Sequence, residues 1–216
     1  KTFEESSLAA ALLHQILGLS ALRLGLNAVA AKNLDRALQY SPATKNYREV
    51  FDAYISSSRK ARFILSRPES VLNNVSALTK EQTSELLYAA AYAYIYSENK
   101  DEEKAVALLE KIQSQDFIHA KALLLLATVQ IGPERNQFRT AAQNLQKAAE
   151  IIKKYENDEA FQVKNSLQLA LARIAFENGL FEAAAEFYLT IPVESHQFLT
   201  AGIENAWASY FGQRYS

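Results

Sequence analysis

Hydrophobic residues return with a helical period along most of the chain. The clearest run begins at Tyr47, where Tyr47, Val50, Phe51, Tyr54 and Ile55 occupy positions i, i+3, i+4, i+7 and i+8. That spacing gathers apolar side chains on one face of an amphipathic helix. With six glycines and four prolines in 216 residues, the chain has little room for the turns of an all-β fold. The pattern therefore predicts an all-α protein.

Small residues lie at fixed offsets within the first stretch, His14–Pro42. Two antiparallel helices approach closely only where one of them places Gly or Ala against the other. The spacing of the small residues therefore predicts a hairpin of two packed helices. The residues at these offsets are Leu17-Gly18, Gly25, Ala30, Leu34, Ala37 and Pro42.

The same spacing returns further along the chain. Ala127 follows Ala93 by 34 residues, and the turn before Ala141 is longer by two residues around Gly132-Pro133. Recurrence at about 34 residues indicates stacked helical hairpins. An interval of twelve residues separates Gly18 from Ala30, Ala93 from Ala105, and Ala172 from Ala184.

We expect the whole chain, 1–216, to form a single solenoid. In the degenerate second unit Pro68 predicts a fresh helix start within an irregular segment, 56–78. Asp101, Glu102 and Glu103 predict the first turn of a later helix, and the helix containing Ile151-Ile152 is expected to continue to Tyr155. The expected units are 8–42, 45–78 (degenerate), 84–116, 119–155, 161–192 and a half repeat or cap over 197–216.

The pattern resembles the tetratricopeptide repeat, in which a Leu-Gly pair in the first helix precedes Ala-x-x-x-Phe in the second and a closing Pro. Here His14, Ala21 and Leu34 replace the usual Trp, Tyr and Phe. The resemblance implies a right-handed α-solenoid of stacked antiparallel hairpins that binds other proteins. The tail from Tyr188 to Trp207 also resembles repeat proteins of bacterial cell envelopes, which favours the periplasm or cell envelope over the cytoplasm by analogy.

Composition narrows the classes of partner. The formal net charge of −1 removes the electrostatic driving force for general nucleic-acid or anionic-membrane binding. Without cysteine there is no disulfide, thiolate chemistry or thioether lipid anchor on this chain, although the compartment stays open. Since the chain starts at Lys1 and contains no methionine, we expect a processed or trimmed segment of a longer protein.

The stretch Leu8–Ala31 is long enough to cross a bilayer and carries Arg23 as its single charge. His14, Gln15 and Asn27 oppose that alternative, and the repeat spacing already explains the two glycines. A packed solenoid hairpin is therefore the favoured interpretation.

The sequence contains no recognisable catalytic motif. His14, His119 and His196 lack the neighbouring ligands of a metal site, and no nucleophile elbow or phosphate loop occurs. Acidic pairs such as Glu102-Glu103 are explained by solvated helix starts. The tyrosines at 88, 92 and 96 are expected to pack in the core. We therefore expect a non-enzymatic protein without metal or cofactor.

The repeat's geometry implies that positions around the small residue of each first helix face a concave groove. This groove would be largely apolar with one cation, suited to an extended or helical segment of a partner protein with hydrophobic anchors. It lacks the Lys, Arg and Asn set that clamps a C-terminal carboxylate in chaperone-binding members of the family. The residues selected are Gln15, Leu19, Leu22, Leu87, Ala90, Tyr94, Leu124, Thr128, Leu169, Arg173 and Phe176.

These expectations favour a scaffold or adaptor within a larger assembly. The alternative is a structural, self-associating segment that stacks end to end through its last helix, Phe198–Phe211. That helix carries Ile203, Ala206, Trp207 and Tyr210 on one face and has no second-helix partner in the chain.

Overall fold

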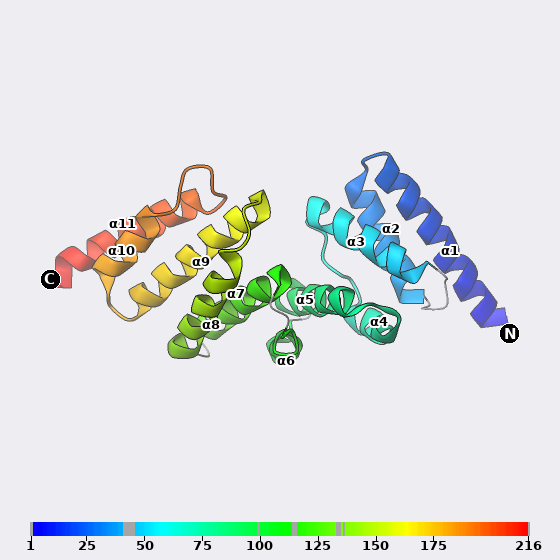
Figure 1. The fold of residues 1–216 in the computed structure, drawn as a ribbon, viewed down its shortest axis with the longest axis horizontal. Helices are drawn as coiled ribbons and strands as arrows, with labels where there is room; N and C mark the ends of the chain where they lie inside the picture. The colour runs from blue at the N-terminus through cyan, green and yellow to red at the C-terminus, as the bar shows by residue number, and fades with distance from the viewer. Residues whose placement is uncertain are drawn as a thin grey trace. The chain divides into compact units, whose positions relative to one another are not determined.

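A computed structural model of the chain describes residues 2–40, 46–98, 100–113, 116–132, 135 and 137–215. Within these ranges it contains eleven α-helices, one short 3-10 helix and no strand (Figure 1). Most helices that follow one another in the chain pack together. The all-α prediction and the packing of neighbouring helices are thus confirmed.

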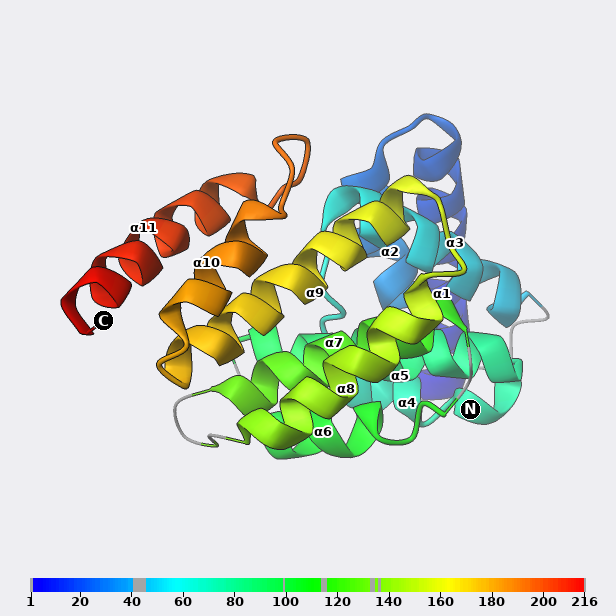
Figure 2. The same cartoon turned by 60° about the vertical axis from the view of Figure 1, so that its left-hand side comes forward.

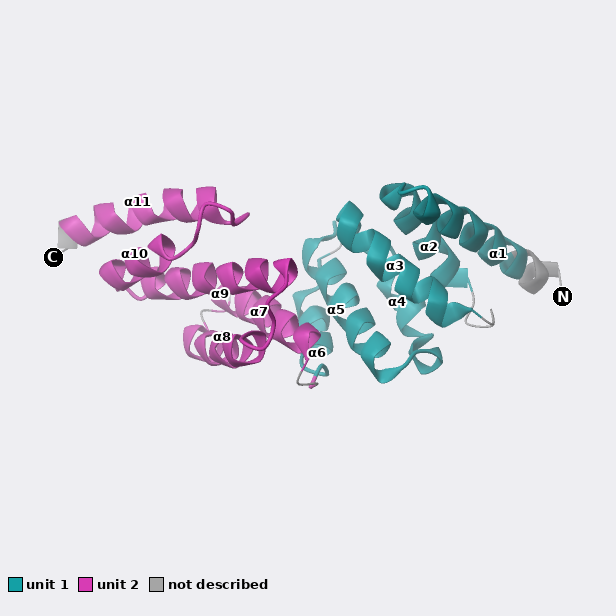
Figure 3. Ribbon diagram, turned by 45° about the horizontal axis from the view of Figure 1, so that its top comes forward, with its two compact units in different colours: residues 1–112 teal, residues 113–216 magenta. Residues whose placement is uncertain are grey.

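The chain divides into two compact units, residues 1–112 and 113–216 (Figure 3). The expectation of one continuous solenoid, and its handedness, stays a prediction. The first unit contains α1 (Thr2–Arg23), α2 (Asn27–Tyr40), α3 (Tyr47–Ala61), α4 (Pro68–Leu72), the 3-10 helix η1 (Val75–Ala77), α5 (Lys80–Tyr96) and α6 (Glu102–Leu109). The second contains α7 (Phe117–Ile131), α8 (Phe138–Ile152), α9 (Asp158–Glu177), α10 (Phe181–Leu189) and α11 (Phe198–Tyr215).

Helices α1 and α2 form the predicted first hairpin, and at Gly18 there is no room for a side chain between them. A Cβ atom at Gly18 would lie 2.6 Å from Cγ of Leu34, which is fully buried on α2. Gly25 turns the chain between the two helices with φ of +74°, a value that glycine adopts without strain. Pro42, the expected end of this hairpin, lies outside the described residues.

This hairpin also accounts for the most apolar stretch of the sequence. Leu8–Ala31 is divided between α1 and α2, because the turn at Gly25 interrupts it. Within the described part of the chain, no helix combines the length and apolar character that a membrane span requires. His14 occupies the expected packing position, where its Nδ1 lies 3.0 Å from Oδ1 of Asn33 and its ring stacks on Tyr40.

Helix α3 carries the predicted apolar stripe, and four of its five members are buried: Tyr47, Val50, Phe51 and Tyr54. Of the segment expected to be irregular, 56–78, the first six residues continue helix α3, and the rest contains only the short helices α4 and η1. Helix α3 ends at Ala61, Arg62 takes the left-handed conformation with φ of 52°, and Pro68 begins the short helix α4 as predicted.

The loop between α3 and α4 is attached to α2 through a buried carboxylate. Asp35, which is 2% exposed, accepts hydrogen bonds from the backbone N–H and the hydroxyl of Ser66. Gln39 Nε2 donates to the same carboxylate at 3.1 Å. Burial raises the pKa of Asp35, and the hydrogen bonds from Ser66 and Gln39 oppose that shift.

Helix α5 begins with a capping box in which the side chains of Thr79 and Gln82 each accept from the other's backbone N–H. Its small residue, Ala93, is buried together with Ala105 of α6. Asp101 caps α6 by accepting from the backbone N–H of Lys104 at 3.0 Å, as the acidic run predicted.

The tyrosine stripe of α5 is not a core stripe. Tyr92 and Tyr96 are exposed, so the expectation that they pack between helices is wrong. Their rings instead contact one another along the helix surface, with centroids 4.4 Å apart. Spacing of three and four residues defines a helix face, but the neighbouring helix decides whether that face is covered.

In the second unit the small residues again lie inside. Ala127, Ala141, Ala172 and Ala184 are all fully buried, as the spacing required. Helix α8 ends at Ile152, so the expected continuation to Tyr155 is wrong. Tyr155 leaves the helix and packs its ring edge-on against Phe117, with centroids 5.2 Å apart. Pro133 of the predicted long turn lies outside the described residues.

Candidate functional site

Three helices of the second unit, α9, α10 and α11, pack around small side chains. Gly179, with φ of +74°, makes the turn from α9 into α10. Figure 2 shows α9, α10 and α11 as successive helices at the C-terminal end of the unit. The core between them is formed by Leu169, Ala172, Ala175, Ala184, Tyr188, Ile191, Ala201 and Ala208. Because most of these side chains are alanines, the helices lie close together and larger residues at their margins enclose a pocket.

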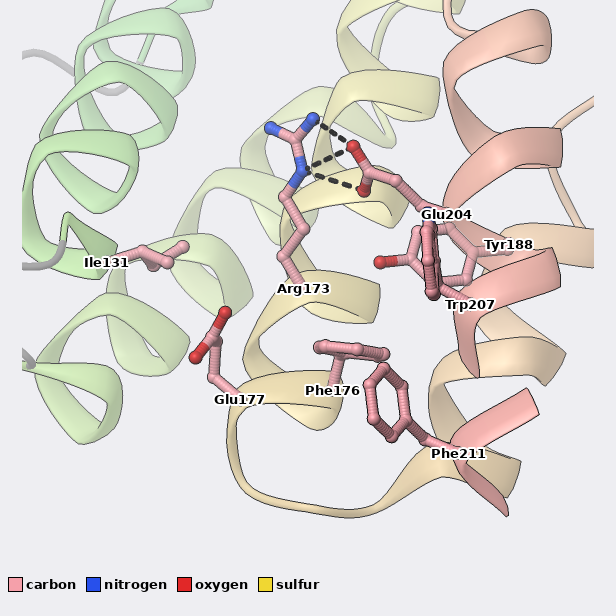
Figure 4. A pocket seen from close by; sticks show the side chains of 8 residues that line it. All are labelled: Ile131, Arg173, Phe176, Glu177, Tyr188, Glu204, Trp207 and Phe211. Carbon is pink, nitrogen blue, oxygen red and sulfur yellow. Dashed lines mark hydrogen bonds and ion pairs between the residues drawn. The ribbon is translucent and has the colours of Figure 1, made fainter. Parts of the chain in front are cut away.

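This pocket has a volume of about 340 Å³ and lies open at the surface. Its size falls at the small end of the range found for ligand pockets in proteins. Side chains from α7, α9, α10 and α11 reach it (Figure 4). The lining residues are Ile131, Arg173, Phe176, Glu177, Tyr188, Glu204, Trp207 and Phe211.

Aromatic rings form one wall of the pocket. Phe176 and Phe211 meet edge to face with centroids 5.8 Å apart, and Trp207 stacks on Phe211 at 6.2 Å. Phe211 also stacks on Phe181, at 5.7 Å. These contacts fix the ring orientations, so the wall is formed in advance of any ligand. Trp207 nevertheless keeps 56% of its surface exposed.

A forked ion pair joins α9 to α11 at the pocket (Figure 4). Arg173 donates from Nη2 to Oε1 of Glu204 at 2.6 Å and from Nε to Oε2 at 2.9 Å. Two parallel hydrogen bonds give this pair a defined geometry that a single contact would lack. Burial, followed by the negative charge of Glu204, raises the pKa of the Tyr188 phenol beside it.

Glu177 is the third charged residue of the pocket. It follows Arg173 by one helical turn on α9 and is exposed. Among the described residues no cation pairs with it, since Arg173 is directed to Glu204 instead. The pocket therefore combines an aromatic wall, one internally neutralised ion pair and one additional carboxylate.

Of the residues predicted to line a concave groove, the structure brings Arg173 and Phe176 into this pocket. Leu169 and Ala90 are buried, and Tyr94, although largely buried, lines a separate cavity in the first unit. Thr128 is exposed, but its hydroxyl donates to the carbonyl of Leu124 on its own helix. The others are partly buried on the helices that carry them, namely Gln15, Leu19 and Leu22 on α1, Leu87 on α5 and Leu124 on α7.

Sequence reasoning missed Glu204 and Phe211 as pocket residues and assigned Trp207 to self-association alone. A usable signal was present, because Glu204, Trp207 and Phe211 fall at i, i+3 and i+7 on one face of α11. What the spacing could not show is that this face meets Arg173, which lies 31 residues earlier in the chain.

The first unit contains a second cavity, which is polar and has a volume of about 620 Å³. The hydroxyl of Tyr94 donates to Oε1 of Glu69 at 2.6 Å, and this hydrogen bond lowers the pKa of the Glu69 carboxyl. Lys104 Nζ lies 3.1 Å from Asp101 and 5.4 Å from the centre of the Tyr94 ring. The polar and charged groups of this cavity therefore interact with one another, and we interpret them as a structural link between α4, α5 and α6.

The described residues contain no group of three or more His, Asp or Glu side chains arranged to hold a metal ion. No protein-family model matches the sequence, and no curated protein is significantly similar to it. The helical hairpins and the pocket formed by α7, α9, α10 and α11 are the features that indicate a function.

Proposed function

We propose that this protein is a non-enzymatic scaffold or adaptor of the tetratricopeptide type, which binds a segment of another protein within a larger assembly. Its hairpins stack as a right-handed solenoid in this proposal. The periplasm or cell envelope is the favoured compartment, by analogy with the repeat proteins that the tail resembles. The observation that carries the proposal is the open aromatic pocket built on helices of hairpin spacing.

Several features of the pocket suit a protein segment as its ligand. Trp, Tyr and Arg are the residues that most often dominate the energy of protein interfaces, and all three line it. Its volume suits one or two side chains of a longer ligand rather than a large cofactor. The ion pair and the ring contacts hold the walls in place, which reduces the entropy lost on binding.

We predict that replacing Trp207 with alanine weakens binding of a peptide ligand about tenfold or more, because tryptophan anchors typically contribute about 2 kcal/mol at interfaces. Peptides would be selected from a displayed library on the full chain, and their dissociation constants measured by calorimetry. Leu189→Ala serves as the matched control, since Leu189 is an exposed apolar residue of α10 outside the pocket. Selected peptides that bind Trp207→Ala as tightly as the parent protein would contradict the proposal.

A second candidate function is self-association, favoured by the exposed stripe of Leu199, Ile203, Trp207 and Tyr210 on α11. Contiguous exposed apolar side chains of this kind often mark protein–protein contact sites. If it mediates stacking, light scattering should show a mass that rises with protein concentration. Ile203→Lys should return the protein to monomers, whereas Lys153→Ala, at an exposed position after α8, should not. A constant monomer mass at all concentrations would exclude this candidate.

A further inference from the structure

We propose that the pocket formed by α7, α9, α10 and α11 accepts a lysine or arginine side chain carried by an otherwise apolar segment of the partner protein. This inference rests on the proposed function and specifies the chemistry of the ligand. It differs from the sequence-based expectation, in which Arg173 was the charge that a partner would meet. The structure changes that expectation because Arg173 is already engaged by Glu204.

The charges of the pocket favour a cation. Three of the lining residues are charged, namely Arg173, Glu177 and Glu204, so the pocket carries a formal charge of −1. The forked pair between Arg173 and Glu204 neutralises two of them. Glu177 then provides the uncompensated carboxylate, and no described residue forms an ion pair with it. An acidic ligand would meet two carboxylates and an arginine that is already paired, which disfavours it electrostatically.

The aromatic wall favours a cation on an apolar stem. Indole and phenyl faces attract ammonium and guanidinium groups that lie within about 6 Å of the ring centre. Trp207 leaves more than half of its surface exposed, and Phe176 and Phe211 extend the wall beside it. The methylene stem of lysine or arginine can pack on these rings while its charged end reaches a carboxylate.

Trp207 also provides the readout, because it is the single tryptophan of the sequence. Four blocked nonapeptides would share flanking leucine and alanine residues and differ only in a central lysine, arginine, norleucine or glutamate. Each would be titrated into the full chain while Trp207 fluorescence is recorded at low ionic strength. We expect the lysine or arginine peptide to bind about fivefold tighter than the norleucine peptide, and the glutamate peptide to bind most weakly.

The decisive variant is Glu177→Gln, which should reduce the preference for the basic peptide to less than about twofold and leave binding of the norleucine peptide unchanged. Glu186→Gln is the control, because Glu186 is an exposed carboxylate of α10 outside the pocket lining. It should leave the preference intact. A preference that survives in Glu177→Gln would overturn the assignment of the carboxylate that recognises the cation.

The outcomes separate this inference from the proposed function. Tightest binding of the norleucine or glutamate peptide would overturn the inference and leave a peptide-binding pocket in place. A failure of all four peptides, with library-selected peptides still binding through Trp207, would do the same. A failure of both peptide sets to change Trp207 fluorescence or to bind by calorimetry would overturn the inference and the proposed function together.

Discussion

Replacing Gly18 with alanine is expected to lower the free energy of unfolding by about 2 kcal/mol, within the range found for overpacked cores. The added Cβ would lie 2.6 Å from Cγ and 2.8 Å from Cδ2 of Leu34, and 3.2 Å from its backbone nitrogen. Leu34 is fully buried and cannot move away freely. Helices α1 and α2 must then separate or Leu34 must leave its preferred rotamer. Urea unfolding followed by far-UV circular dichroism measures the loss.

Gly202 provides a matched control for this substitution. It lies inside helix α11 and is exposed, and a Cβ built on it would meet nothing within 4 Å. Gly202→Ala should therefore stabilise the protein by about 0.5–1 kcal/mol, the difference in helix propensity between the two residues. The same substitution is therefore expected to lower the free energy of unfolding at position 18 and to raise it at position 202. A stabilising Gly18→Ala would show that α1 and α2 do not approach as closely as the structure indicates.

Leu34→Ala is expected to have a still larger effect, a loss of about 2–5 kcal/mol, because it removes a fully buried side chain and leaves a cavity at the hairpin contact. Fraying of α1 is the expected structural consequence, since Leu34 is the side chain that its Gly18 meets. Amide hydrogen exchange across α1 and α2 would report that loss, and urea unfolding would give its size.

The double variant Gly18→Ala, Leu34→Ala tests whether the two effects have one cause. With Leu34 shortened, the clashes of the added Cβ at position 18 with Cγ and Cδ2 disappear, and only its 3.2 Å approach to the backbone nitrogen at position 34 is left. We expect the double variant to be more stable than the sum of the single effects predicts, by at least about 1 kcal/mol. Strict additivity would mean that Gly18 and Leu34 do not share a contact.

The small residues show how far sequence reasoning reaches. Gly18, Ala93, Ala127 and Ala172 were selected from spacing alone, and all four are buried. The starts of α4 and α6 were also predicted from the sequence. Pro68 occupies the first turn of α4 and Asp101 caps α6, and both effects involve only neighbouring residues of the backbone. The burial predicted from periodicity was wrong for Tyr92 and Tyr96, which lie exposed on a face of α5.

The candidate site was likewise predicted only in part. Arg173 and Phe176 could be placed on one face of α9 from their spacing, and they line the pocket. The charge that a ligand meets could not be predicted, because it depends on Glu204 approaching Arg173 from another helix. Tyr94, which was selected for a groove, is largely buried and lines the polar cavity of the first unit, where its hydroxyl donates to Glu69.

The amino-acid sequence determined that this chain is helical, where its helices make their closest contacts, and which turns separate them. These features depend on backbone propensity, side-chain size and spacing within about one hairpin, all of which are local properties. Only the tertiary structure decided which helix faces are covered, that Arg173 pairs with Glu204, and that Glu177 remains as the additional charge beside an aromatic wall. Those outcomes depend on contacts between residues far apart in the chain, whose distances follow from packing rather than from sequence separation.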